Sequence, residues 1–380
     1  MKKLLSFILA FFIAFSVFSY ISEENLQENE ILTQDHTNSQ ALNSSTTQAS
    51  NDDFMASSKM LTYLNVNENS LNQAINSNQD QMPITRVFAT ISSLTALLEL
   101  LYPQGMIGRN YKPYPEDIPF MPQGVASLPV LGARTRINYE ALLALKPELI
   151  IFDKLSFKDF SKPYEALGIK ILQADHDFSS LDATIKAYGE ALGVQERANR
   201  LLSFYNKTQS LLDDLRDKIT KKPRIYFAFG VEGLHSVCVK KGQDDDLATA
   251  IGGENVIKCE QITTSVNLLP MSFETLIALN PEAIFVREIG LYKDLKEGKL
   301  EQWQRLEAIK NGRFYYAPSS PSNWLNRPPT VMRILGFPWA FSKLHSELLS
   351  ENEVRTLAKE FFAEFLRPIS DEDYDKLEGK

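Results

Sequence analysis

Two separate segments of this chain repeat one pattern of residue types. Residues 138–152 read NYEALLALKPELIIF, and residues 272–286 read SFETLIALNPEAIFV. In each copy an aromatic residue precedes a glutamate, and an apolar run with helical spacing, a Pro-Glu pair and a second apolar run follow. Proline ends the helix because its ring cannot continue the hydrogen-bond ladder. The second apolar run is typical of a strand that is buried on both faces of a parallel sheet.

A helix that leads into a parallel strand is half of a crossover unit. Two copies so far apart therefore predict two lobes of the same topology rather than a solenoid, whose period is much shorter. The predicted fold class is α/β, with two similar lobes, each a mostly parallel sheet flanked by helices. Other segments fit this fold, with strands at 86–90, 106–108, 168–174, 224–230 and 313–318, and helices at 95–101 and 246–251.

One long helix is expected to join the two lobes. Residues 195–219 carry an apolar stripe at helical spacing, and a shorter helix is predicted before them at 180–193. About 25 residues with a rise of 1.5 Å each span roughly 37 Å, which is long enough to brace both lobes.

The N-terminus differs in composition from the rest. Lys2 and Lys3 precede an almost wholly apolar run, which predicts a secretory signal peptide. An uncleaved membrane anchor is the alternative, although the run is short for a membrane span. A polar segment rich in Asn, Gln and Ser follows and is predicted to be a disordered tether. The expected organisation is a signal peptide at 1–20, the tether at 21–80, an N-terminal lobe at 81–180, connecting helices at 181–220, a C-terminal lobe at 221–350, and a C-terminal helix and tail at 351–380.

Composition and motifs exclude several classes of function. The net charge is −8 and there is no dense Lys/Arg stripe, so we expect no nucleic-acid partner. The catalytic signatures H-E-x-x-H, C-x-x-C, P-loop and G-x-S-x-G are missing from the sequence, so we expect that the protein is not an enzyme. The sequence holds only four His and no cluster suited to a bare metal ion, so a chelated metal fits better. Cys238 and Cys259 form either a disulfide or two buried thiols.

The order of motifs resembles the periplasmic solute-binding proteins of ABC importers for iron–siderophore complexes and vitamin B12, the helical-backbone class III type. The resemblance covers roughly residues 83–348 and depends on the two repeats and the order of three further motifs. These are LGVQERA before the long helix, GGENV, and WQRLEAIKNGR. The segment SSPSNWLNRPPTVMRILGFPWAFSKL resembles enterochelin-type and nickel-chelate-binding members.

The resemblance implies a role for the glutamate of each repeat. In that family one carboxylate per lobe docks into an arginine pocket on the membrane permease, and Glu140 and Glu274 match those positions. The alternative is that each carboxylate is simply favoured in the first turn of its helix. The resemblance further implies a periplasmic monomer that works with an ABC permease and its ATPase at the inner membrane.

The ligand is expected between the lobes, at the carboxyl ends of the strands. Three arginines lie at predicted strand ends or helix starts and would suit an anionic chelate. The predicted ligand-binding residues are Arg109, Tyr111, His235, Arg287, Trp324 and Arg327, with Phe229 as a further aromatic contact.

Two of these residues also have a plainer interpretation. Arg287 beside Glu288 is also explained by a surface ion pair of little energy. His235 is a candidate metal or ligand contact because catecholate-binding relatives use a loop histidine, and the alternative is a histidine that is merely exposed in its loop.

No permanent cofactor is expected, and the predicted cargo is a chelate of Fe(III) or Ni(II). A ferric siderophore is the leading candidate, followed by a nickel or cobalt chelate such as a histidine complex, and then heme or a corrinoid. Two rival classes of function are an enzyme on nitrogenase-like lobes, which would need cluster cysteines in both lobes, and an adhesion protein that uses the polar tether.

Overall fold

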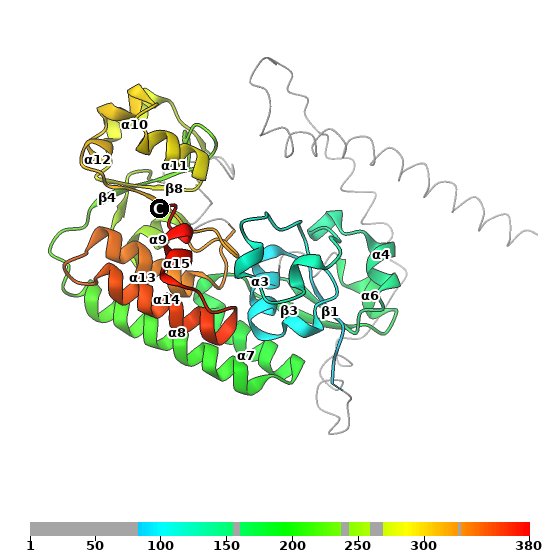
Figure 1. The fold of residues 1–380 in the computed structure, drawn as a ribbon. Coiled ribbons are helices and arrows are strands. Elements are labelled where there is room, and N and C mark those ends of the chain that lie inside the picture. Colours follow the sequence, from blue (N-terminus) through cyan, green and yellow to red (C-terminus); the bar gives the residue numbers. More distant parts are fainter. Residues whose placement is uncertain (1–82, 155–159, 237–242, 259–268, 326–327) are drawn as a thin grey trace, which may run out of the picture. The chain divides into compact units, whose positions relative to one another are not determined.

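The computed structural model describes residues 83–154, 160–236, 243–258, 269–325 and 328–380 (Figure 1). The predicted signal peptide and tether, both cysteines and Arg327 lie outside the described residues. Within the described ranges, no helix combines the length and apolar character needed to cross a membrane.

The N-terminal sheet contains three parallel strands in the order β1-β2-β3. Met106 forms an isolated parallel bridge to Val87 of β1, so the strand predicted at 106–108 is reduced to a single bridge. Two buried clusters cover the two faces of the sheet, one with α3 and the other with α4 and α6. The elements are β1 (Val87–Ala89), α3 (Ser92–Leu101), α4 (Tyr139–Ala144), β2 (Leu149–Asp153), α6 (Lys162–Glu165) and β3 (Lys170–Ala174).

The C-terminal sheet contains four parallel strands in the order β6-β4-β8-β9. A short antiparallel pair, β5 with β7, lies beside it in the same lobe. The elements are β4 (Arg224–Ala228), β5 (His235–Ser236), α9 (Gln243–Ala250), β6 (Glu254–Asn255), β7 (Leu269–Pro270), α10 (Phe273–Leu279), β8 (Ala283–Val286), α11 (Ile289–Lys296), α12 (Glu307–Lys310) and β9 (Phe314–Tyr316). Two similar parallel α/β lobes confirm the predicted fold class.

The two repeats adopt the same backbone arrangement. Val87 of β1 pairs with Leu149 of β2, and Ile225 of β4 pairs with Ala283 of β8, which is the same register in each lobe. Lys146 and Asn280, each followed by proline, both have positive φ angles, of 51° and 39°. The repeat therefore extends from sequence to backbone geometry.

The glutamate of each Pro-Glu pair has the same structural role in both lobes. A Glu148 carboxylate oxygen accepts a hydrogen bond of 3.0 Å from the backbone N–H of Arg86, at the start of β1. A Glu282 oxygen accepts one of 3.0 Å from the N–H of Arg224, at the start of β4. Each guanidinium in turn donates to a carbonyl near the end of its repeat helix, of Lys146 for Arg86 and of Leu279 for Arg224. Each carboxylate thus fixes the arginine at the start of the neighbouring strand, which directly precedes β1 in one lobe and is the first residue of β4 in the other.

Strand alternation in the repeats divides the interior in the same way. In β8, Ala283 and Phe285 face the large cluster that both lobes share, whereas Ile284 and Val286 face a cluster within the C-terminal lobe. The side chains of β2 alternate in the same way. Residues 149 and 151 face the shared cluster, and residues 150 and 152 face the cluster of the N-terminal lobe.

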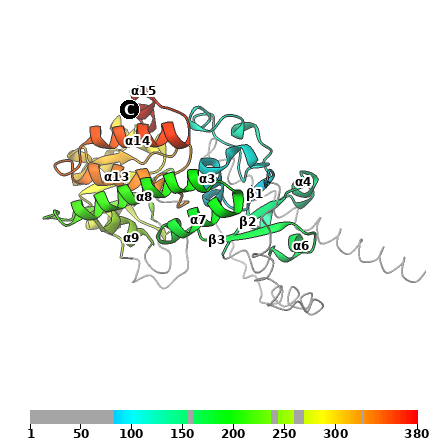
Figure 2. The ribbon, with the colours of Figure 1, turned by 90° about the horizontal axis from the view of Figure 1, so that it is seen from below.

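Helices outside the sheets complete the shared cluster (Figures 1 and 2). The long helix α8 ends at Arg216, somewhat before the predicted end, and packs against α13. Gly193, with a φ angle of 70°, caps the C-terminus of α7 and lets the chain turn into α8. These helices are α7 (Leu181–Leu192), α8 (Gln195–Arg216), α13 (Arg333–Leu344), α14 (Glu351–Phe365) and α15 (Asp371–Leu377).

Candidate functional site

The loops that follow the parallel strands carry most of the polar side chains of interest. Arg109 follows the bridge at Met106, and Arg287 follows β8 directly. Ser320 lies in the loop after β9. Because carboxyl ends of parallel strands lie at one edge of a sheet, these loops are where a ligand site is expected.

Arg109 is buried and has a carboxylate partner. Its guanidinium donates to Glu99 Oε1 at 2.5 Å, and the two side chains are 10% and 3% exposed. Burial raises the pKa of Glu99 to about 7, although the positive charge of Arg109 acts against this rise. The sequence prediction missed Glu99, whose signal is a lone carboxylate in the apolar helix SSLTALLELL. A ligand-binding role for Arg109 stays a prediction, since its guanidinium is already paired.

Asp117 connects the two lobes through a hydrogen bond. Its Oδ1 accepts from the Ser320 hydroxyl at 2.5 Å, and its Oδ2 accepts from the Tyr114 N–H at 3.3 Å. Burial raises the pKa of Asp117, while these two donors act to lower it. The carbonyl of Ser320 accepts from the indole N–H of Trp324 at 3.0 Å, which holds the C-terminal loop on the core.

Tyr316, at the end of β9, lies near charges from both lobes. Its hydroxyl is 2.7 Å from the Ser319 hydroxyl. Burial raises the pKa of Tyr316, the Ser319 bond opposes this, and the charges of Asp117, Glu116 and Arg287 also act on it. These charged groups therefore lie within electrostatic reach of one hydroxyl. We define the interlobe cluster as Glu99, Arg109, Asp117, Arg287, Tyr316 and Ser320.

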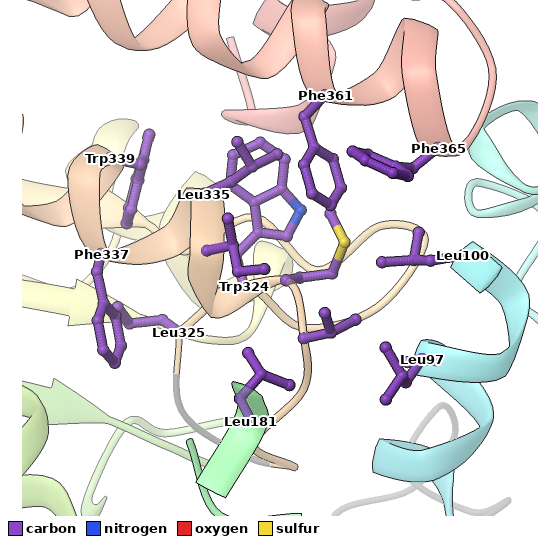
Figure 3. Close-up of a cluster of buried hydrophobic side chains, with 14 of the residues drawn as sticks. Leu97, Leu100, Leu181, Trp324, Leu325, Leu335, Phe337, Trp339, Phe361 and Phe365 are labelled. Atoms are coloured by element: carbon purple, nitrogen blue, oxygen red, sulfur yellow. The ribbon is translucent and has the colours of Figure 1, made fainter. Parts of the chain in front are cut away.

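The remaining predicted ligand residues are distributed unevenly. Tyr111 is 62% exposed, and His235 is half-buried with its ring against Gly230, where φ is 80°. Phe229 is buried, and its backbone pairs with that of His235. Trp324 is fully buried in the shared cluster (Figure 3), so in this structure it is a core residue and presents no face for stacking. Arg287 donates to Glu288 at 3.3 Å, as the plainer interpretation anticipated.

A small recess lies near the carboxyl end of β3. His176 lines it, and its Nδ1 is buried with no hydrogen-bond partner among the described residues. Both lobes contribute to the lining, which is Ser93, Leu94, Leu97, Asp175, His176, Phe178, Leu181, Thr184, Pro329, Thr330 and Val331. In the described ranges no three His, Cys, Asp or Glu residues gather into a metal-binding group.

A wider hollow of ≈ 820 Å³ lies on α8 and α14, around Phe204 and Phe365. Its lining contains no residue from the loops that follow the strands, so its size alone does not make it the ligand site.

Glu140 and Glu274 occupy equivalent exposed positions. Each lies in the first turn of its repeat helix, α4 or α10. Asn138 and Ser272 cap these helices by accepting a hydrogen bond from the backbone N–H three residues later. The carboxylates are thus held on short, capped helices and form no ion pair within the described part of the chain. This geometry fits both interpretations of the two glutamates, namely docking onto a membrane permease and a carboxylate that is favoured in the first turn of its helix.

Comparisons with known proteins agree with this architecture. A family model described as "Periplasmic binding protein" matches residues 107–321, more than half of the chain. The chain is similar to the high-affinity heme uptake system protein IsdE of Staphylococcus aureus, with 25% identity over 238 residues, or 60% of this chain and 78% of that protein.

Solved structures are similar over most of the described residues. One is an ABC transporter solute-binding protein from Sulfurospirillum deleyianum, with 29% identity, a TM-score of 0.70, and coverage of 78% of this chain and 94% of that one. Another is the TroA-like periplasmic binding protein FepB from Veillonella parvula, with 22% identity, a TM-score of 0.61 and coverage of 77% and 94%, which supports the fold alone. This chain therefore belongs to the periplasmic binding protein family, as a class III, non-enzymatic substrate-binding component of an ABC importer.

Proposed function

We propose that this protein captures a metal chelate at the carboxyl ends of its two sheets and delivers it to a membrane permease. Solute-binding proteins of ABC importers work with a permease and an ATPase, so both are partners at the class level. The interlobe cluster is the observation that carries the proposed location. It brings side chains from loops in both lobes together through the Asp117–Ser320 hydrogen bond.

Two considerations support a chelated metal as the cargo. The relative IsdE is named as a component of a heme uptake system, and heme is a metal chelate. The sequence offers no set of ligands for a bare ion. The sequence ranks a ferric siderophore first, a nickel or cobalt chelate second, and heme or a corrinoid third, and this order is part of the proposal.

Delivery is proposed to use Glu140 and Glu274. Both are exposed, and both sit on the same structural frame in their lobes, so a permease with two similar halves would meet one carboxylate on each side. Export by the N-terminal segment, with the periplasm as the place of action, belongs to the same proposal.

The function is tested by titrating the full chain with nickel–histidine, ferric tris-hydroxamate, ferric tris-catecholate, heme and cobalamin. Tryptophan fluorescence reports binding because Trp324 is bonded to the loop that carries Ser320. We expect saturable quenching by at least one chelate at micromolar concentration or below. If none of them binds while a metal-free solute does, the metal-chelate proposal is wrong.

A further inference from the structure

Two arginines at the carboxyl ends of the strands are already paired with a carboxylate within the protein. Arg109 is paired with Glu99 at 2.5 Å, and Arg287 is paired with Glu288 at 3.3 Å. The first pair is deeply buried, with side chains 10% and 3% exposed, and the second is partly exposed. Each of these two arginines would therefore have to share or exchange its carboxylate partner in order to bind an anionic ligand.

Releasing Arg109 for an anionic ligand would be unfavourable. Glu99 lies on α3 inside the shared core, where only 2% of the residue is exposed. If Arg109 turned to a ligand, Glu99 would be left buried without its cation and would have to take up a proton to avoid an unpaired buried charge. The Arg109–Glu99 pair therefore behaves as part of the fold and not as an anion receptor.

The same region also carries two carboxylates, Asp117 and Glu116. Asp117 receives hydrogen bonds from the Ser320 hydroxyl and the Tyr114 N–H, and among the described residues it has no ion-pair partner. Glu116 beside it is exposed. Burial is the main cause of the raised pKa of Tyr316; both carboxylates add to this rise and Arg287 opposes it, so charges of both signs act at the end of β9. A half-buried carboxylate such as Asp117 is screened less by water and salt than one on the surface.

We infer, on the basis of the proposed function, that the cargo is a chelate of zero or positive net charge, and that Asp117 is a specificity-determining residue that repels anionic chelates. Ferric tris-hydroxamates and nickel–histidine complexes belong to this class, and the strongly anionic ferric tris-catecholates do not. This is opposite to the charge preference that the arginines alone led us to expect from the sequence. Like charges brought close together during binding are penalised, which is how such a carboxylate excludes the wrong partner.

The test compares dissociation constants for three ferric chelates of one metal and different charge. These are a tris-hydroxamate with a free ammonium group, a neutral tris-hydroxamate and a tris-catecholate. Wild-type protein should bind one of the two hydroxamates at least about tenfold more tightly than the tris-catecholate. The Asp117→Asn variant keeps an oxygen that accepts the Ser320 bond, removes the charge and gives up the longer bond from the Tyr114 N–H, and it should reduce this ratio by about fivefold. The matched control is Asp214→Asn, an exposed carboxylate on α8.

The outcomes separate this inference from the proposed function. If the tris-catecholate binds as tightly as the hydroxamates or more tightly, the charge inference is wrong and the metal-chelate proposal stands. If Asp117→Asn, with an unchanged thermal unfolding midpoint, leaves the ratio as it is in the wild type, Asp117 does not set the preference. If no chelate binds, including nickel–histidine, heme and cobalamin, both proposals fail.

Discussion

The two lobes share a frame but differ in the loops that the frame supports. The frame includes an arginine at the start of one strand, a Pro-Glu pair that fixes it, and a capped helix with one exposed glutamate. The loops after the strands have no such correspondence. The N-terminal lobe contributes Asp117 from a long loop, whereas the C-terminal lobe contributes Ser320 from a loop anchored by Trp324.

This difference separates two tasks. Features that serve both halves of a partner are expected to be repeated, and features that recognise one asymmetric ligand are expected to be unique. The repeated glutamates are therefore assigned to delivery and the unrepeated loops to binding.

The largest expected effect comes from the repeated frame. Replacing Glu140 and Glu274 together with Ala should abolish uptake of the chelate by whole cells and leave its dissociation constant unchanged. The physical reason is that both carboxylates are exposed and make no contact with the interlobe cluster. Uptake and binding are measured on the same variant.

The control for this pair uses two other exposed first-turn glutamates. Glu196 of α8 and Glu307 of α12, replaced together with Ala, should leave uptake near the wild-type rate. Normal uptake by the Glu140/Glu274 variant would mean that these carboxylates only stabilise their helices.

A smaller effect distinguishes the two frames by their stability. Glu148 accepts bonds from the N–H and hydroxyl of Thr85 and from the N–H and guanidinium of Arg86, whereas Glu282 accepts from Lys221 and the N–H of Arg224. Glu148→Ala should therefore cost more stability than Glu282→Ala, each within about 1–3 kcal/mol. Denaturant unfolding measures both, and an equal or reversed order would show that the number of bonds does not set the loss.

Protonation of Glu99 should stabilise the folded protein at low pH, which is opposite to the effect expected for Glu282 of the C-terminal frame. Its pKa is about 7 in the folded protein, above the value of 4.5 expected for the unfolded chain. The folded state then holds this proton more tightly, so the contribution of Glu99 to stability is present at low pH and is lost as pH rises toward about 7.

The measurement is the free energy of unfolding between about pH 5 and 8 for the wild type and Glu99→Gln. The variant should show a flatter profile over this range. Glu148 and Glu282 should act in the opposite direction at lower pH, because hydrogen bonds from Thr85 and Lys221, respectively, lower their pKa values. A profile of Glu99→Gln that is parallel to the wild type would contradict the assignment.

The smallest expected effect is the movement between lobes. The long helix α8 and the shared cluster connect the two lobes, so ligand binding should close them by a few degrees and not by tens of degrees. Small-angle scattering with and without the chelate checks this, and a large fall in the radius of gyration would contradict it.

Much of the fold was predictable because the repeats carry strong local signals. Pro147 and Pro281 mark the ends of the helices, and the apolar runs after them mark β2 and β8. The strand at 106–108 was overestimated, because three residues next to a glycine and a long loop form only one bridge to β1.

The site was predicted less well because its contacts span long distances in sequence. Asp117 and Ser320 are joined across most of the described chain, and no local pattern marks such a pair. Trp324 is predicted to contact the ligand, but in the structure its indole N–H donates to the Ser320 carbonyl and its ring packs against Phe362 of α14. The residues around Trp324 in the sequence give no sign of this contact with a distant helix. Ligand binding by Tyr111, His235, Arg287 and Arg327 stays a prediction.

The central claim is that the unrepeated interlobe loops bind the cargo and the repeated frame delivers it. The most direct test is the dissociation constant of neutral ferric tris-hydroxamate, or of nickel–histidine if it binds more tightly, for two double variants. Asp117→Ala with Ser320→Ala should change the constant by about tenfold or more, because it removes the contact that joins the two loops. Glu140→Ala with Glu274→Ala should leave it unchanged. The account would be contradicted if the Asp117/Ser320 variant bound the chelate as tightly as the wild type, or if the Glu140/Glu274 variant bound it more weakly.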